Sequence, residues 1–176
     1  MDSRGRHQGT LFLGGAALIG SIHAGFSAYW AFGGDWLLGA LGAVTDRFES
    51  GSTATIGALL AVAVLKGLLA WGPLLTRRWI GFAGIAVRKA AAFGGLVLAI
   101  YGTVLTVVGL VALTGVFGEP SDPVALTGHA VLWDPLFALW GVLLLLGLAK
   151  TRRSRRVARP QDSEVGRERL ALVSAR

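Results

Sequence analysis

The stretch TATIGALLAVAVLKGLLAWGPLL, residues 53–75, decides the fold of this chain. Lys66 is its only charged residue, and the run is long enough to cross a hydrocarbon core of about 30 Å, which needs roughly 20 helical residues. It lacks the alternation of apolar and polar residues that the strands of a membrane barrel require. Because only a helix satisfies all its backbone polar groups within one segment in lipid, the run predicts a transmembrane helix.

Three further apolar runs accompany this one, at roughly Leu11–Phe32, Ala91–Val116 and Ala125–Ala149. The chain has 176 residues, 53% of them hydrophobic, and no cysteine. A soluble domain of this size could not bury four such runs in one core. The lack of cysteine excludes disulfides, thiolate catalysis and cysteine-ligated metals. We therefore expect an all-α, polytopic membrane four-helix bundle over residues 1–150.

The segments between the runs alternate in the sign of their charge. The first and third connections are mainly acidic, whereas the N-terminus, the second connection and the start of the tail are basic, through Arg4, Arg6, Arg77, Arg78, Arg88, Lys89, Lys150 and the arginines up to Arg159. Cytoplasmic loops are the ones enriched in Lys and Arg, so we expect a multi-pass protein of the bacterial plasma membrane with both termini cytoplasmic. A cleaved signal peptide is disfavoured because the first run continues to Phe32 without a small-x-small cleavage site.

The tail after the fourth run, residues 151–176, has a different composition. Its first part is densely basic and the remainder mixes acidic and basic residues after Pro160. We expect a poorly ordered cytoplasmic tail whose arginines mark the inner end of the fourth helix and bind anionic lipid headgroups. A nucleic-acid partner is disfavoured because no aromatic residue interleaves with the arginines.

Each apolar run carries one polar residue near its middle: His23, Lys66, Tyr101 and Asp134. At 1.5 Å per residue, His23 and Asp134 both lie about 13–14 Å below the outer boundary of the membrane. Polar groups at this depth are costly, and they usually face the bundle interior and have partners. The positions predict a central polar band to which all four helices contribute.

Two interpretations of this band remain open. In the functional one, His23 and Asp134 are candidate catalytic residues, since imidazole titrates near neutral pH and a buried carboxyl can act as acid or base. In the structural one, Lys66 and Asp134 form an ion pair, and His23 and Tyr101 hydrogen-bond around it to fix the register of the helices.

Asp134 also precedes Pro135, which suggests a break or kink in the fourth helix. Proline is favoured at the first helical position and Asp is a favoured N-cap, so Asp134 would cap an inner piece, Pro135–Ala149. That piece would be about 22 Å long, too short to span comfortably. The segment before it must then enter the membrane too, and a broken helix at that depth lines a cavity or is buried in protein.

Aromatic and small residues add candidate contacts. Trp30 shares a face of the first helix with His23 and Ser27, and Trp133 and Trp140 share a face of the fourth. Interfacial anchoring or packing is the commoner role of Trp, but with Lys66 and Tyr101 these three are candidate ligand-binding residues. Rows of small residues indicate close helix packing: Ala17, Ser21 and Gly25; Gly95, Ala99 and Thr103; and Gly102 with Gly109.

Two short motifs carry a family resemblance. Tyr29-Trp30-Ala31-Phe32-Gly33-Gly34 ends the first run, and Leu132-Trp133-Asp134-Pro135-Leu136 precedes a leucine run that reaches Gly147. Together they resemble a family of small bacterial, mostly actinobacterial, four-helix integral membrane proteins of unknown function, over about residues 10–150. The family often has His three positions before the Trp, where this chain has Ser27; His23 lies one turn earlier on the same face. The resemblance implies a fold and a membrane but no reaction.

Three functions fit these observations. The first is a membrane module that binds a lipophilic small molecule or a membrane protein partner through its central polar site. The second is an acid–base enzyme on a lipophilic substrate, of the isoprenoid isomerase or cyclase type, in which Trp133 and Trp140 stabilise a carbocation. The third is a proton-coupled carrier, which is disfavoured because no internal repeat is visible. We expect no cofactor and no metal site, since the three histidines have no clustered carboxylates.

Overall fold

The chain is all-helical over the residues that the computed structural model describes, 3–47, 52–79 and 81–151. The helices, in order, are α1 (Ser3–Ala31), the 3-10 segment η1 (Leu38–Arg47), α2 (Thr53–Leu75), the turn η2 (Thr76–Arg78), α3 (Phe82–Leu113), α4 (Pro123–Gly128), η3 (His129–Trp133) and a final helix over 134–151. Four stretches are long and apolar enough to cross a membrane: His7–Ala31, Thr53–Arg78, Phe82–Leu113 and Pro123–Thr151. The expected four-span helical fold is confirmed.

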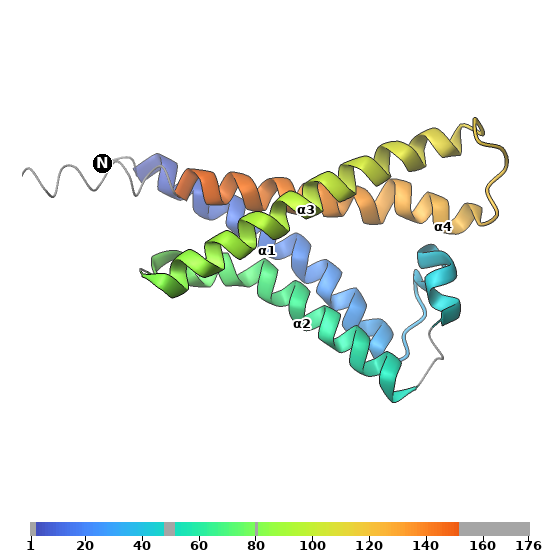
Figure 1. The fold of residues 1–176 in the computed structure, drawn as a ribbon, viewed down its shortest axis with the longest axis horizontal. Helices are drawn as coiled ribbons and strands as arrows, with labels where there is room; N and C mark the ends of the chain where they lie inside the picture. The colour runs from blue at the N-terminus through green and yellow to red at the C-terminus, as the bar shows by residue number, and fades with distance from the viewer. Residues whose placement is uncertain (1–2, 48–51, 80, 152–176) are drawn as a thin grey trace, which may run out of the picture.

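The spans form two pairs that make a V (Figure 1). One arm holds α1 and α2, and the other holds α3 and the fourth span; the arms meet near the N-terminus of α1 and diverge toward the η1 end. A core drawn from all four spans closes the narrow end, and it consists of Leu13, Ala16, Ala70, Ala91, Trp140, Leu144 and Leu148. η1 lies in the mouth of the V, where Gly128 packs against Ala40.

Local signals explain where the helices begin and end. The Ser52 hydroxyl accepts a hydrogen bond from the Thr55 amide, and the Asp122 carboxylate accepts one from the Ala125 amide, so each caps a helix start. Pro123 follows Asp122 in the first turn, where its missing N–H would have had no helical partner in any case. These caps place the start of the fourth span at Pro123.

Glycine allows the two spans of the second arm to approach closely. Gly95, Gly102 and Gly109 recur every seven residues on α3 and are all buried. A Cβ on Gly102 would lie 2.3 Å from the amide nitrogen of Ala138, so backbone meets backbone there. Close helix packing through small residues, as predicted, is therefore seen along Gly95, Gly102 and Gly109. Thr103, which was predicted to belong to a row of small residues spaced four apart, is exposed instead.

The fourth span is irregular immediately before Pro135. His129–Trp133 form a π turn, in which the Asp134 amide donates to the carbonyl oxygen of His129. Asp134 itself has helical backbone angles (φ −72°, ψ −41°), so the helix continues through it and Asp134 is not an N-cap. The irregularity expected at Pro135 thus takes the form of a widened turn, which is often found at functional sites.

Candidate functional site

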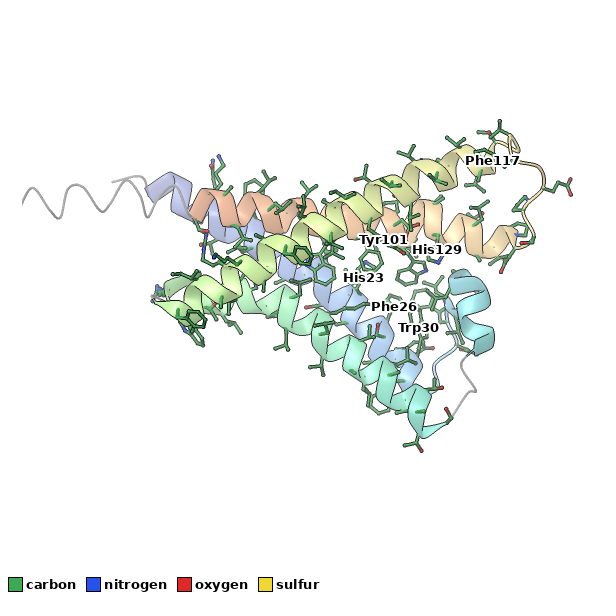
Figure 2. The ribbon with its side chains drawn as sticks, viewed as in Figure 1. His23, Phe26, Trp30, Tyr101, Phe117 and His129 are labelled. Carbon is green, nitrogen blue, oxygen red and sulfur yellow. The ribbon has the colours of Figure 1, made fainter. Side chains whose placement is uncertain are left out.

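His23 is the centre of a buried group between the two arms (Figure 2). It lies on α1 and is only 2% exposed, as is Ser27 one turn later. The Ser27 hydroxyl donates to the His23 carbonyl oxygen at 3.2 Å, a bond between residues four apart on a helix. The shared face predicted for these two residues is therefore the one that points into the protein.

Lys66 reaches this pair from α2. Its Nζ donates to the Ser27 Oγ at 2.9 Å and makes a longer contact of 3.5 Å to the His23 carbonyl oxygen. Helical side chains lean toward the N-terminus of their helix, and α2 runs antiparallel to α1 (Figure 1), so the lysine stem extends toward Ser27. Lys66 and Asp134 form no ion pair, which makes the structural interpretation of the central band wrong on that point.

The fourth span contributes three aromatic side chains to the same place. The Phe137 ring stacks on His23 with centroids 4.0 Å apart, and the Lys66 Nζ lies 5.7 Å from the Phe137 centroid. The Trp133 and Trp140 rings lie 5.8 and 5.9 Å from that of His23. We call this group the central cluster; its members are His23, Ser27, Lys66, Trp133, Phe137 and Trp140.

The central cluster has more hydrogen-bond donors than acceptors. His23 Nε2, Trp133 Nε1 and Trp140 Nε1 are all buried and form no hydrogen bond to any residue that the structure describes. An indole N–H can only donate, so Trp133 and Trp140 each need an acceptor. A buried polar group without a partner costs about 1–3 kcal/mol. The imidazole of His23 and the two indoles beside it are three such groups, and they are consistent with a site that receives an oxygen-bearing molecule.

Asp134 belongs to a second, adjacent polar pair. Its Oδ1 lies 3.3 Å from Nδ1 of His129, and Asp134 is 2% exposed whereas His129 is partly exposed. The π turn places these two residues five apart in sequence on the same side of the helix. Asp134 shares no hydrogen bond with His23, so the two candidate catalytic residues lie in neighbouring sites rather than in one.

The other candidates lie at the edges of the central cluster. Tyr101 meets Phe137 edge-on at 6.0 Å and is 48% exposed, so it forms a rim rather than part of the interior. Trp30 contacts Trp133 edge-on at 5.5 Å, and its indole donates to the Trp36 carbonyl oxygen at 3.0 Å. Trp30 is therefore already hydrogen-bonded and supports the site through packing.

An apolar groove lies nearby, toward the mouth of the V. It has a volume of about 240 Å³ and is lined by Gly25, Phe26, Tyr29 and Trp36. Phe26 contacts Trp133 edge-on at 5.0 Å, so one side chain separates this groove from the central cluster. An aromatic path thus joins the open surface of α1 to His23.

Sequence reasoning missed three contributors. Phe137 is the stacking partner of His23, and its only signal was its place one turn after Trp133. Phe26 was missed because its contact with Trp133 joins the two arms. The pairing of His129 with Asp134 was missed because it depends on the π turn. Within the described residues, no group of three His, Cys, Asp or Glu side chains is placed to hold a metal ion.

Residues 20–144 match the family model described as "Protein of unknown function (DUF3995)". The chain belongs to this family. Neither the curated proteins nor the solved structures gave a significant match. The matched stretch contains the whole central cluster and the His129–Asp134 pair, so both sites lie within the part of this DUF3995 chain that defines the family. The resemblance seen in the sequence is confirmed as to family, and the family description names no reaction.

Proposed function

We propose that this DUF3995 protein binds a lipophilic small molecule at the central cluster, between its two helix pairs. The observation that carries the proposal is the set of three buried, unpartnered ring nitrogens in Trp133, Trp140 and His23. Ordinary packing would place apolar side chains there at no such cost. A bound molecule with carbonyl, carboxylate or phosphate oxygens would satisfy the two indole donors and the imidazole together.

Access from the lipid supports this proposal. Lys66 and Phe137 are only half-buried, and Tyr101 beside Phe137 is exposed. All three lie within spans, at Thr53–Arg78, Pro123–Thr151 and Phe82–Leu113, so the medium at their exposed surfaces is the membrane interior. A lipophilic molecule would therefore enter laterally from the lipid at these surfaces rather than from water.

We further infer that both termini are cytoplasmic in the bacterial plasma membrane. One end of the bundle brings together the start of α1, the α2–α3 connection and the end of the fourth span, and its described basic residues include Arg77, Arg88 and Lys150. The opposite end carries Asp35, Glu119 and Asp122. This separation of charge supports the inward orientation of the basic end. The basic tail beyond residue 151, with its expected anionic lipid partners, lies outside the described residues.

The binding proposal is tested by native mass spectrometry combined with lipid extraction. Wild type purified in a mild detergent should carry a defined small molecule. Trp133→Phe removes one indole donor but keeps an aromatic ring, so retention of that molecule should fall. Trp71→Phe is the matched control, because the Trp71 indole donates to Ser21 on the exposed side of α1. Equal retention by both variants, or no retained molecule in any sample, would refute the proposal.

The acid–base enzyme remains a second candidate because of the His129–Asp134 pair. A carboxylate that is 2% exposed and paired to a histidine, within the same helix as Trp133 and Trp140, is an arrangement that could move a proton on a bound isoprenoid-like substrate. Asp134→Asn discriminates the two functions. A pure binding protein would retain the same molecule in this variant, whereas an enzyme would accumulate its unconverted substrate, detected as a different mass.

A further inference from the structure

We propose that the ligand of the central cluster is an amphiphilic anion, a carboxylate or phosphate group attached to a hydrocarbon chain. This inference rests on the proposed function and names the chemistry of its ligand. It starts from the charge of Lys66, which the membrane environment makes costly.

Lys66 has a charge without a counter-charge. No carboxylate oxygen of the described residues lies within 4.0 Å of its Nζ, and its two acceptors, the Ser27 hydroxyl and the His23 carbonyl, are both neutral. The one carboxylate in the central band, Asp134, pairs with His129 instead. A charged side chain in the middle of a span is costly and usually has a partner. An anionic ligand at Lys66 would offset that cost.

The donors around Lys66 agree with the same ligand. An ammonium group has three protons, and Ser27 and His23 engage two of them. On the other side of the contact with His23, the rings of Trp133 and Trp140 lie 5.8 and 5.9 Å from the imidazole, and their nitrogens can only donate and have no described acceptor. Carboxylate and phosphate groups offer several acceptor oxygens at once, and hydrogen bonds to an ionised partner are roughly twice as strong as neutral ones. A neutral alcohol offers a single oxygen and would leave most of these donors unmet.

The hydrocarbon chain of such a ligand has a route out. Lys66 is half-buried, so its ammonium group lies between the central cluster and the surface of α2. The neighbouring surface is apolar and exposed, with Leu65 on α2 and Ile100, Tyr101 and Val104 on α3. A chain leaving the cluster there would lie in lipid along these side chains, with its anionic end at Lys66. The geometry therefore suits a single-chain lipid acid better than a molecule that is polar throughout.

The test uses three probes that share one chain: hexadecanoic acid, hexadecyl phosphate and hexadecanol. Each is titrated into delipidated, full-length protein, and binding is followed by native mass spectrometry. We expect at least one of the two anions to bind about tenfold tighter than hexadecanol, because a hydrogen bond between two ionised groups is stronger than one to a neutral hydroxyl. The two anions distinguish a carboxylate ligand from a phosphate ligand.

Variants of Lys66 link this preference to the site. Lys66→Met keeps the length of the side chain and should abolish the preference for the anions, whereas Lys66→Arg should retain it. Lys89→Met is the control, because Lys89 is exposed at the basic end of α3 and lies outside the central cluster. A preference that persists in Lys66→Met but disappears in Lys89→Met would place the anion at the membrane surface and overturn the inference.

The remaining outcomes separate this inference from the proposed function. If all three probes bind equally and Trp133→Phe weakens each of them, the protein binds lipophilic molecules but the ligand is not an anion. If none binds to the folded, delipidated protein, the proposed function fails as well.

Discussion

At the scale of single residues, the distinctive feature of this bundle is Lys66, a charged side chain in the middle of a span. Its stem crosses from α2 to α1 and places a cation at the Ser27 hydroxyl and the His23 carbonyl oxygen, 5.7 Å from the centroid of the Phe137 ring. Helix packing alone does not require a charged side chain at this depth, and such a side chain is costly in lipid. The hydrogen bond from Lys66 to Ser27, at 2.9 Å, is the interaction that holds the cation in place.

A double-mutant cycle measures that bond. Ser27→Ala should lower the free energy of unfolding by about 1–3 kcal/mol, because a charged donor loses its nearest acceptor. In the Lys66→Met background, Ser27→Ala should cost much less, since no ammonium group remains to be satisfied. The measurement is denaturant unfolding in detergent, with Ser21→Ala as the control on an exposed hydrogen bond. Additive effects of Ser27→Ala and Lys66→Met would show that the two side chains do not interact.

At the scale of helices, the close contact between α3 and the fourth span is what positions Asp134, Phe137 and Trp140. Gly102 approaches the backbone of Asp134 and Ala138, and Gly141 approaches the backbone of Ala99. On the fourth span, these contacts fix the rotation of the helix and so determine which side chains face His23.

Gly102→Ala should therefore destabilise the protein by about 1–3 kcal/mol, the usual cost of overpacking. The added methyl group would lie 2.5 Å from the Asp134 carbonyl oxygen and 2.3 Å from the Ala138 amide nitrogen, so the two helices must separate. The matched control is Gly67→Ala, in the middle of α2, where an added Cβ meets nothing within 4 Å. Thermal unfolding in detergent compares the two, and equal midpoints would contradict the close packing of α3 against the fourth span.

The sequence was informative about helices and less so about their contacts. The lengths of the apolar runs predicted the four spans. Of the four polar residues expected in a central band, His23 and Lys66 meet in the central cluster, whereas Asp134 pairs with His129 and Tyr101 lies at the rim. Asp134 and Pro135 together suit an N-cap as well as a widened turn, and local sequence cannot separate the two. The π turn occurs where Gly109 packs against Ala130, a contact between residues distant in sequence. The hydrogen bond from Lys66 to Ser27 depends on how α1 and α2 align, which the sequence of either helix alone does not determine.

At the scale of the whole molecule, the V shape combines a packed end with an open one. The core at the narrow end joins all four spans, whereas the arms diverge toward η1 (Figure 1). His23, at the centre of the central cluster, lies where the arms separate (Figure 2), next to the core of the packed end. With both termini inside, the mouth of the V would lie in the outer half of the bilayer.

That orientation is open to a direct test, because the chain has no cysteine of its own. Single substitutions Glu119→Cys, His7→Cys and Lys89→Cys each place one thiol at an exposed position. Glu119 lies between α3 and α4, His7 near the start of α1 and Lys89 in the first part of α3. A membrane-impermeant maleimide applied to intact cells should label Glu119→Cys alone, and permeabilised cells should show labelling of all three. Labelling of His7→Cys or Lys89→Cys in intact cells would reverse the inferred topology.

The central claim, that a specific lipophilic molecule occupies the site between the arms, is tested most directly by photo-crosslinking in the membrane. A benzoylphenylalanine placed at Phe137 reports on the central cluster, and one placed at Phe93, which is 72% exposed on α3, reports on bulk lipid. After irradiation, intact-protein mass spectrometry should show one discrete adduct at position 137 and a mixture of phospholipid adducts at position 93. The same mixture at both positions, or no adduct at 137, would contradict the account.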